Sequence, residues 1–244
     1  MAQIVLFNKP FNVLTQFRPE GERMTLAHYI DDKSLRVAGR LDYDSEGLLL
    51  LTDDGQLNQH LTHPNTKQFK TYLVQVDGVP NQQAIEQLKS GVALKDGLTL
   101  PAHTRVISEP DWLWSRDPPI RYRANLPTSW LEIKICEGKN RQVRRMTAAV
   151  GLPTLRLIRT QIGPFYLEDL ALGELKALDG NHYAEKLNMN QRTGGSGSFG
   201  LSTKTPSTGS GGSAGVNRFG NPVVKDLDRR NKRRRTLPIA SRGK

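Results

Sequence analysis

The sequence has almost no cysteine and no long apolar segment. Cys136 is the single cysteine among 244 residues, which excludes a disulfide within the chain and a metal clip of paired cysteines. No stretch approaches the roughly 20 apolar residues that a membrane span requires. The first ten residues lack the basic region of a secretory signal, and their apolar run is short. We therefore expect a soluble, cytoplasmic protein that makes no contact with membranes.

The sequence also lacks the motifs of several common enzyme classes. No glycine-rich phosphate or dinucleotide loop follows a predicted strand, and no His-x-Glu is followed by the cysteine pairs of zinc deaminases. The acidic residues at positions 42, 44, 46, 53 and 54 suggest a calcium loop, but the glycine at its sharp turn and the glutamate at its twelfth position are missing. These absences leave one acidic loop and one basic stretch as places where chemistry could occur.

The positive charge is concentrated at one end of the chain. The formal net charge is +11, and residues 191–244 contribute +10 of it, with 12 of the 35 basic and 2 of the 24 acidic residues. Residues 191–216 contain eight glycines and few large apolar side chains, too few to offset the entropy lost on ordering. We expect one folded domain over residues 1–187, followed over residues 188–244 by a disordered Gly/Ser-rich linker and basic tail. Such a tail favours a polyanionic partner, most often a nucleic acid, although it could also be a dispensable extension.

Hydrophobic periodicity predicts an α+β fold in which strands outnumber helices. The predicted strands cover residues 4–7, 70–76, 130–136, 155–159 and 174–178, and the predicted helices cover residues 56–61, 81–90 and 140–150. Asn81 and Asn140 are the predicted N-caps of the last two helices, and Gly91 and Gly151 follow their ends. Because most strands follow one another directly, we expect a mixed or largely antiparallel sheet flanked by helices. The composition of residues 109–127 predicts an extended loop with aromatic and basic side chains at its tip.

The most informative segment runs from Gly39 to Gly55 and reads GRLDYDSEGLLLLTDDG. Four consecutive leucines between turn residues are typical of a strand that is buried on both faces. Arg40 and Asp42 therefore lie in the loop that leads into the core, together with further acidic residues. A loop anchored at its far end by a rigid strand can hold a reactive carboxylate. The alternative is that these residues are ordinary solvated loop charges.

A stretch without acidic residues extends from Lys139 to Arg159. It contains six basic residues: Lys139, Arg141, Arg144, Arg145, Arg156 and Arg159. Three of the arginines share one face of the predicted helix, and a stripe of one sign favours contact with RNA phosphates over an ordinary solvated face. We expect Lys139, Arg141 and Arg145 to contact RNA in this way. One of the arginines could also pair with the loop carboxylate and keep it ionised as a nucleophile or base.

The acidic loop resembles the catalytic motif of the RsuA-type pseudouridine synthases in two adjacent segments, Gly39–Asp42 and Asp44–Leu49. Three further segments match that family in the expected order, namely Asn8-Lys9-Pro10, Lys70-Thr71-Tyr72 and residues 137–146, which read EGKNRQVRRM. Within the family, the insertion around Trp112, Trp114 and residues 117–121 resembles the branch that modifies large-subunit ribosomal RNA. The resemblance extends from residue 3 to about residue 180 and implies the pseudouridine synthase fold.

The resemblance also implies roles for individual residues. Asp42 would be the catalytic aspartate, which attacks or deprotonates the ribose at C1′ of the target uridine before uracil detaches, rotates and rejoins through C5. Tyr72 would stack on the base and take the C5 proton, Arg144 would pair with the aspartate, and Leu157 would form an aliphatic wall of the pocket. Arg40 would help to flip the uridine out of its stem. Packing within the fold is the alternative role for Tyr72 and Leu157.

The same resemblance implies no metal or organic cofactor and a ribosomal RNA substrate. We expect a monomeric isomerase that acts on one uridine of 23S rRNA. The alternatives are the same reaction on small-subunit rRNA or tRNA, and a non-catalytic RNA-binding or ribosome-assembly protein. Because Asn8-Lys9-Pro10 comes so early, we expect no small S4-type RNA-binding domain before the core. RNA affinity would then come from the core, the tryptophan- and arginine-containing insertion, and the basic tail.

Overall fold

A computed structural model describes residues 2–63, 66, 68–120, 127–167 and 170–186 and organises them around one large sheet. The chain divides into two units, Met1–Gly195 and Ser196–Lys244, and every described residue belongs to the first. The expected linker and basic tail therefore lie outside the described residues, as do Arg121 and Arg123 of the expected loop.

The large sheet contains nine of the described strands: β1 (Gln3–Lys9), β4 (Arg36–Val37), β5 (Glu46–Thr52), β6 (Lys70–Asp77), β9 (His103–Ile107), β10 (Thr128–Ile135), β11 (Thr154–Ile162), β12 (Phe165–Tyr166) and β13 (Leu175–Asp179). Two small ladders join β2 (Val13–Leu14) to β3 (Met24–Thr25), and β7 (Ala93–Leu94) to β8 (Gly97–Leu98). The described helices are α1 (Gly55–Thr62), α2 (Gln82–Ser90), α3 (Gln142–Ala149), α4 (Gly180–Lys186) and the 3₁₀ helix η1 (Leu26–His28). None of the described helices is both long and apolar enough to cross a membrane.

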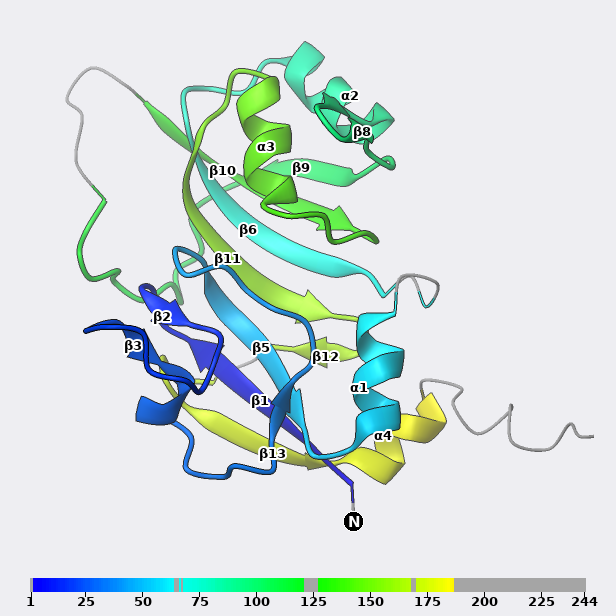
Figure 1. Cartoon of the computed structure of the whole chain (residues 1–244). Helices are drawn as coiled ribbons and strands as arrows, with labels where there is room; N and C mark the ends of the chain where they lie inside the picture. Colours follow the sequence, from blue (N-terminus) through cyan, green and yellow to red (C-terminus); the bar gives the residue numbers. More distant parts are fainter. Residues whose placement is uncertain (1, 64–65, 67, 121–126, 168–169, 187–244) are drawn as a thin grey trace, which may run out of the picture. The chain divides into compact units, whose positions relative to one another are not determined.

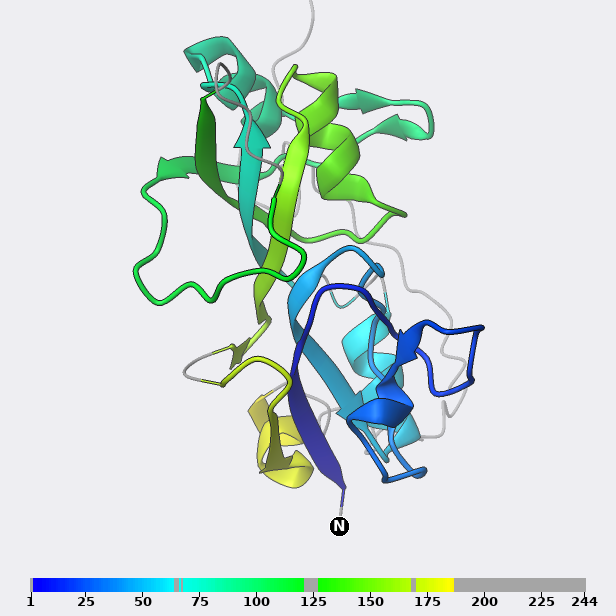
Figure 2. The same ribbon diagram turned by 90° about the vertical axis from the view of Figure 1, so that its left-hand side faces the viewer.

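The sheet is mixed, which confirms the α+β prediction. Its main order is β13-β1-β5-β11-β6-β10-β9, with β12 added on β11 and β4 on β5. Among the described strands of this sheet, β5 and β11 form the one parallel pair, and the other pairs are antiparallel. The helices α2 and α3 lie over the half that contains β6 and β10, and α1 lies beside β5 (Figure 1). The insertion at residues 108–120 and α3 lie on opposite sides of β11 (Figure 2).

The leucine run forms the central strand β5, as predicted. Leu48, Leu49, Leu50 and Leu51 are all 0% exposed. Leu48 and Leu50 pack into one apolar cluster with α1, and Leu49 and Leu51 pack into another with η1. Complete burial of a leucine stabilises a fold by about 1.5–3 kcal/mol relative to an exposed one. The loop that precedes β5 is therefore anchored to the most deeply buried strand of the described fold.

The predicted helix caps hold for α2 but not for α3. Asn81 caps α2 by accepting a hydrogen bond from the backbone N–H of Ala84 at 2.8 Å, and Gly91 ends that helix with φ of 105°. For α3, the prediction of Asn140 as N-cap was wrong. The cap position is Arg141, which has a left-handed backbone with φ of 46° and forms no side-chain cap hydrogen bond. The reason is tertiary, because the side chain of Arg141 is held by a carboxylate of the acidic loop.

Glycine is required where the acidic loop enters β5. Gly47 has φ of 96°, a conformation that other residues adopt at a cost. A Cβ atom at this position would clash with the carbonyl oxygen of Arg159 and lie 2.9 Å from its backbone nitrogen. The missing side chain thus allows β5 and β11 to approach closely at the base of the loop.

Candidate active site

The acidic loop forms one wall of a cavity of about 840 Å³. The opposite walls come from the start of β6, the middle of β11, the end of α1 and the segment that leads into α3. Six of the residues predicted for the site line this cavity: Arg40, Asp42, Tyr72, Lys139, Arg141 and Leu157. They come from four separate parts of the chain, so the fold brings together what the sequence leaves far apart.

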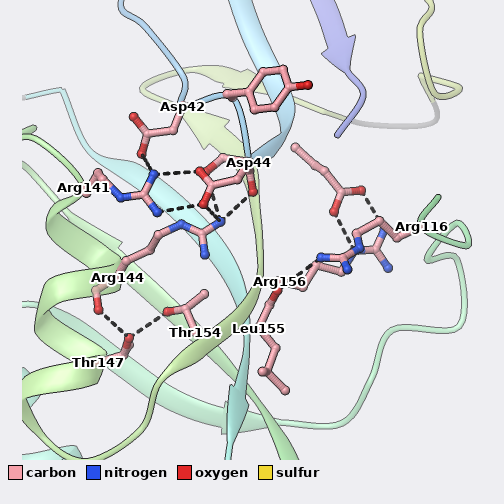
Figure 3. Close-up of polar contacts among 12 residues, drawn as sticks. Asp42, Asp44, Arg116, Arg141, Arg144, Thr147, Thr154, Leu155 and Arg156 are labelled. Carbon is pink, nitrogen blue, oxygen red and sulfur yellow. Dashed lines mark hydrogen bonds and ion pairs between the residues drawn. The ribbon is translucent and has the colours of Figure 1, made fainter. Parts of the chain in front are cut away.

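Two arginines hold the acidic loop through Asp44 (Figure 3). Arg141 donates two hydrogen bonds to the Asp44 carboxylate, at 2.8 and 2.7 Å. Arg144 donates to the backbone carbonyl of Asp44 at 2.6 Å, and its Nη2 lies 3.4 Å from Asp44 Oδ2. Burial alone would raise the pKa of Asp44, but the hydrogen bonds from Arg141 and the charge of Arg144 outweigh it and hold that pKa below its ordinary value. The two guanidinium groups therefore fix the loop through its second acidic residue.

Asp42 contacts the same arginine, Arg141, at a longer distance than Asp44 does. Its side chain is 35% exposed, and its Oδ2 lies 3.7 Å from Nη1 of Arg141. The expected pair between Arg144 and Asp42 is not among the ion pairs of the described residues, and Arg141 takes that place. Arg141 is the N-cap residue of α3, so its side chain can reach the acidic loop from the end of the helix. Arg144 contacts the same loop from within the helix. Asp42 is therefore held less closely than Asp44, and it lines the cavity.

A flat apolar wall faces the cavity from the neighbouring strands. Tyr72 on β6 is 8% exposed, Leu157 on β11 is 5% exposed, and both line the cavity. They belong to the same apolar cluster, on the face of the sheet that α2 and α3 cover. An aromatic ring beside an aliphatic side chain offers a surface on which a planar base can stack.

The basic side chains predicted to bind RNA separate into different environments. Arg40 is exposed at the cavity, and Lys139 is half-buried in its wall. Arg145 instead forms a two-bond pair with Asp96, at 2.6 and 2.9 Å, and it is not a lining residue. Acidic residues distant in sequence pair with both Arg141 and Arg145, and contact of these arginines with RNA stays a prediction.

Sequence reasoning missed a buried ion pair behind the acidic loop. Arg156 on β11 donates to Glu46 at the start of β5 through two bonds of 2.8 Å, and the side chains are 6% and 1% exposed. Trp114 donates its indole N–H to the same carboxylate at 2.8 Å and accepts a bond from Arg156 at its carbonyl. Trp114 was expected at the tip of an RNA-binding loop, but it anchors the insertion to the loop base, whereas Trp112 is 56% exposed. The signal was an acidic residue at the first position of a buried strand.

Lys9, part of the first matching segment, is completely buried beside the acidic loop. Its Nζ donates to the carbonyls of Pro10 at 2.7 Å, Val13 at 2.9 Å and Tyr43 at 3.5 Å. Burial lowers the pKa of Lys9 to about 7, against the opposing charges of Glu46 and Asp44. Lys9 thus ties the end of β1 to the acidic loop with an amine that titrates near neutral pH.

This shift predicts a pH-dependent stability that Lys9→Met should remove. Since the pKa of Lys9 is lower in the folded than in the unfolded state, the unfolded chain binds more protons between about pH 7 and pH 10, and the free energy of unfolding rises across that range. The stability of the wild type relative to Lys9→Met should therefore increase from pH 7 to pH 10, as measured by urea unfolding at several pH values. Lys89→Met, at an exposed lysine of α2, should run parallel to the wild type. A constant difference between wild type and Lys9→Met would contradict the shifted pKa.

The cavity combines the partly exposed carboxylate of Asp42, a flat apolar wall and several cationic side chains. Within the described part of the chain, no group of three His, Cys, Asp or Glu side chains could hold a metal ion. The volume of the cavity is in the usual range for a pocket that holds a small organic ligand. The arrangement can therefore hold a small planar ligand against Tyr72, with a polar group of that ligand near Asp42.

Comparisons with known proteins give a consistent result. A sequence model of the family described as RNA pseudouridylate synthase matches residues 3–149. The chain is 54% identical over 176 residues to the ribosomal large subunit pseudouridine synthase E of Vibrio parahaemolyticus, an alignment that covers 72% of this chain and 74% of the relative. It is 55% identical over 170 residues to the protein of the same name from Xanthomonas axonopodis, with 69% of this chain and 90% of the relative covered. A crystal structure of a pseudouridylate synthase is similar with a TM-score of 0.62 and 30% identity, over 77% of this chain and 74% of the other.

Proposed function

Because the chain belongs to the RNA pseudouridylate synthase family, we propose that it converts one specific uridine of 23S rRNA to pseudouridine, with Asp42 as the catalytic carboxylate. The observation that carries this proposal is the position of Asp42 in the cavity that Tyr72 and Leu157 also line. The choice of large-subunit RNA is supported by relatives more than 50% identical that are named for that substrate.

The proposed reaction exchanges one bond at C1′ of the ribose. The carboxylate of Asp42 supplies an electron pair to C1′ while the C1′–N1 bond breaks, and its electrons remain on the uracil ring. Uracil then turns against Tyr72, C5 forms the new bond to C1′, and the Asp42 oxygen leaves. The ring is neutral once C5 bonds to C1′. The C5 proton then leaves, with Tyr72 as its proposed acceptor, while N1 gains a proton from solvent, which completes the isomerisation.

The other residues are proposed to position the loop and the RNA. Arg141 and Arg144 hold Asp44, and so fix the backbone two residues after the nucleophile. Arg40 is exposed at the cavity, where it can occupy the space that the flipped uridine leaves in its stem. Lys139 at the cavity wall and Arg145 outside it would contact RNA phosphates.

We propose residues 1–187 as the catalytic domain and residues 188–244 as a linker with a basic RNA-binding tail. The net charge of +10 in residues 191–244 supports this role, since basic segments attract RNA in a salt-dependent manner without reading its sequence. The tail would then raise the affinity for ribosomal RNA, while the domain selects the nucleotide.

The proposed function is tested by mapping pseudouridines across total RNA at single-nucleotide resolution. The comparison is between cells that lack the gene and the same cells that carry the wild-type gene. We expect one 23S position to lose its pseudouridine and to regain it on complementation. A lost position in 16S rRNA or tRNA would contradict the proposed substrate. Loss of no position would overturn the proposed activity and favour a binding role in ribosome assembly.

A further inference from the structure

A guanidinium group without a counterion lies at the wall of the cavity. Arg159 on β11 pairs with Tyr72 of β6 on one side and with Gly47 of β5 on the other. It therefore lies between the apolar wall that contains Tyr72 and the acidic loop. It is 3% exposed and lines the cavity. Its Nε donates to the carbonyl of Leu48 at 2.8 Å, and its Nη1 donates to the carbonyl of Arg40 at 3.3 Å.

The third nitrogen of this side chain is unused. Nη2 of Arg159 is buried and has no hydrogen-bond partner among the described residues. Within the part of the chain that the structure describes, Arg159 forms no ion pair, in contrast to Arg141 and Arg156 on either side of the loop. A buried donor that stays unpaired is uncommon in a folded protein and requires an explanation. A substrate group that arrives only during the reaction would supply one.

A second cation lies at the same wall. Lys70 at the start of β6 lines the cavity, and its Nζ donates to the carbonyl of Gln68 at 3.1 Å. Burial, and next the charge of Arg159, lower the pKa of Lys70. The carboxylate of Asp44 is occupied by Arg141, so it does not neutralise this wall. The side of the cavity next to Tyr72 therefore has two cationic side chains that can stabilise a negative charge on a bound group.

We propose that Arg159, assisted by Lys70, stabilises the negative charge that develops on uracil when the C1′–N1 bond breaks. This inference depends on the proposed function. The electron pair of the broken bond passes to N1 and is shared with the O2 and O4 carbonyl oxygens, while Asp42 supplies the pair that C1′ needs. The charge disappears when C5 bonds to C1′ and Asp42 leaves as a carboxylate, and a proton afterwards moves from C5 to N1. Fixed positive charge next to developing negative charge, in a site that excludes water, is commonly the largest contribution to catalysis.

The position of Arg159 matches this role better than a purely structural one. A base stacked on Tyr72 would lie beside the strand position that Arg159 occupies, because the two residues are partners in the β6–β11 ladder. Holding the loop requires only the two hydrogen bonds to Leu48 and Arg40, which leave Nη2 unused. The proposal accounts for the unused donor and for the second cation together.

The test varies the leaving base. Target RNA is prepared with either uridine or 5-fluorouridine at the modified position, and loss of the original N-glycosidic nucleotide is measured under single-turnover conditions. 5-Fluorouracil is the more acidic base, so its anion needs less stabilisation. We expect Arg159→Gln to slow the reaction of uridine by about 10²–10³-fold, as for removal of one oxyanion donor, and that of 5-fluorouridine by at least about tenfold less. Lys70→Met should show the same selectivity between the two bases with a smaller loss of rate. This variant also tests the inference if Arg159→Gln does not fold, because it keeps the hydrogen bonds of Arg159 to the carbonyls of Leu48 and Arg40.

Two comparisons separate this role from simple support of the loop. Arg156→Gln removes a buried arginine that does not line the cavity, so it should slow both substrates by the same factor. Arg159→Lys keeps the charge and should also affect both substrates nearly equally. Equal losses on the two bases in Arg159→Gln and Lys70→Met would overturn the inference and leave the proposed function intact. Failure of the wild-type protein to convert uridine would overturn the proposed function itself.

Discussion

Asp42→Asn is expected to lower the single-turnover rate of pseudouridine formation by at least about a thousandfold. The amide has the shape of the carboxylate but lacks its negative charge, so it cannot supply the electron pair that C1′ requires. We expect little change in the stability of the fold, because Asp42 is 35% exposed and its ion contact with Arg141 is long, at 3.7 Å. The measurement is conversion of a 23S rRNA fragment by purified enzyme in excess, with the thermal unfolding of each protein recorded alongside.

The matched control for this variant is Asp53→Asn. Asp53 follows the opposite end of β5, is exposed, and accepts a hydrogen bond from the backbone N–H of Gln3 at 2.8 Å, which an asparagine oxygen can also accept. This control should retain the wild-type rate, since it changes the same chemical group far from the cavity. If Asp42→Asn kept more than about a tenth of the wild-type rate while folded, the assignment of Asp42 as nucleophile would be wrong.

The parts of the fold that depend on local sequence could be predicted. The run Leu48–Leu51 predicted a strand buried on both faces, and all four side chains are inaccessible to solvent. The alternating segment at residues 70–76 predicted β6, and Asn81 with Gly91 predicted both ends of α2. Each of these signals acts over a few residues, through side-chain periodicity or a local hydrogen bond, so no tertiary partner is needed to recognise it.

The arrangement of charges could not be predicted in the same way. Arg141 and Asp44 are 97 residues apart, and Arg156 and Glu46 are 110 apart, so no local pattern records their contacts. The resemblance to a known family suggested that Arg144 pairs with Asp42, but Arg141 leaves the helix and takes that position. For the same reason no local pattern predicts that Arg159 and Lys70 line one side of the cavity, because β6 and β11 are neighbours only in the folded sheet.

Two arginine–glutamate pairs in the sheet have nearly the same geometry but opposite exposure. Arg156 binds Glu46 through two bonds of 2.8 Å, with side chains 6% and 1% exposed. Arg105 binds Glu132 through bonds of 2.7 and 2.9 Å, with side chains 69% and 31% exposed. Water can replace the partner of an exposed charge, but a buried charge that loses its partner stays unsolvated. The same substitution should therefore have very different effects at the two sites.

Glu46→Gln is expected to lower the free energy of unfolding by about 3–5 kcal/mol, because it leaves the Arg156 guanidinium buried without a counterion. That loss is a large fraction of the total stability of an ordinary domain, which is about 5–15 kcal/mol. Glu132→Gln should leave the free energy of unfolding nearly unchanged. Both values are measured by urea unfolding at neutral pH.

Removing both charges of the buried pair should restore much of the free energy of unfolding that is lost in Glu46→Gln. The double variant Glu46→Leu, Arg156→Met replaces two ions with apolar groups, and such replacements of buried pairs are often neutral or stabilising. Its stability should exceed that of Glu46→Gln, although the indole N–H of Trp114 then lacks the acceptor that it has in the wild type. If Glu46→Gln lowered the free energy of unfolding by less than about 1 kcal/mol, the buried pair would behave like an exposed one, and it could not be what fixes the base of the acidic loop.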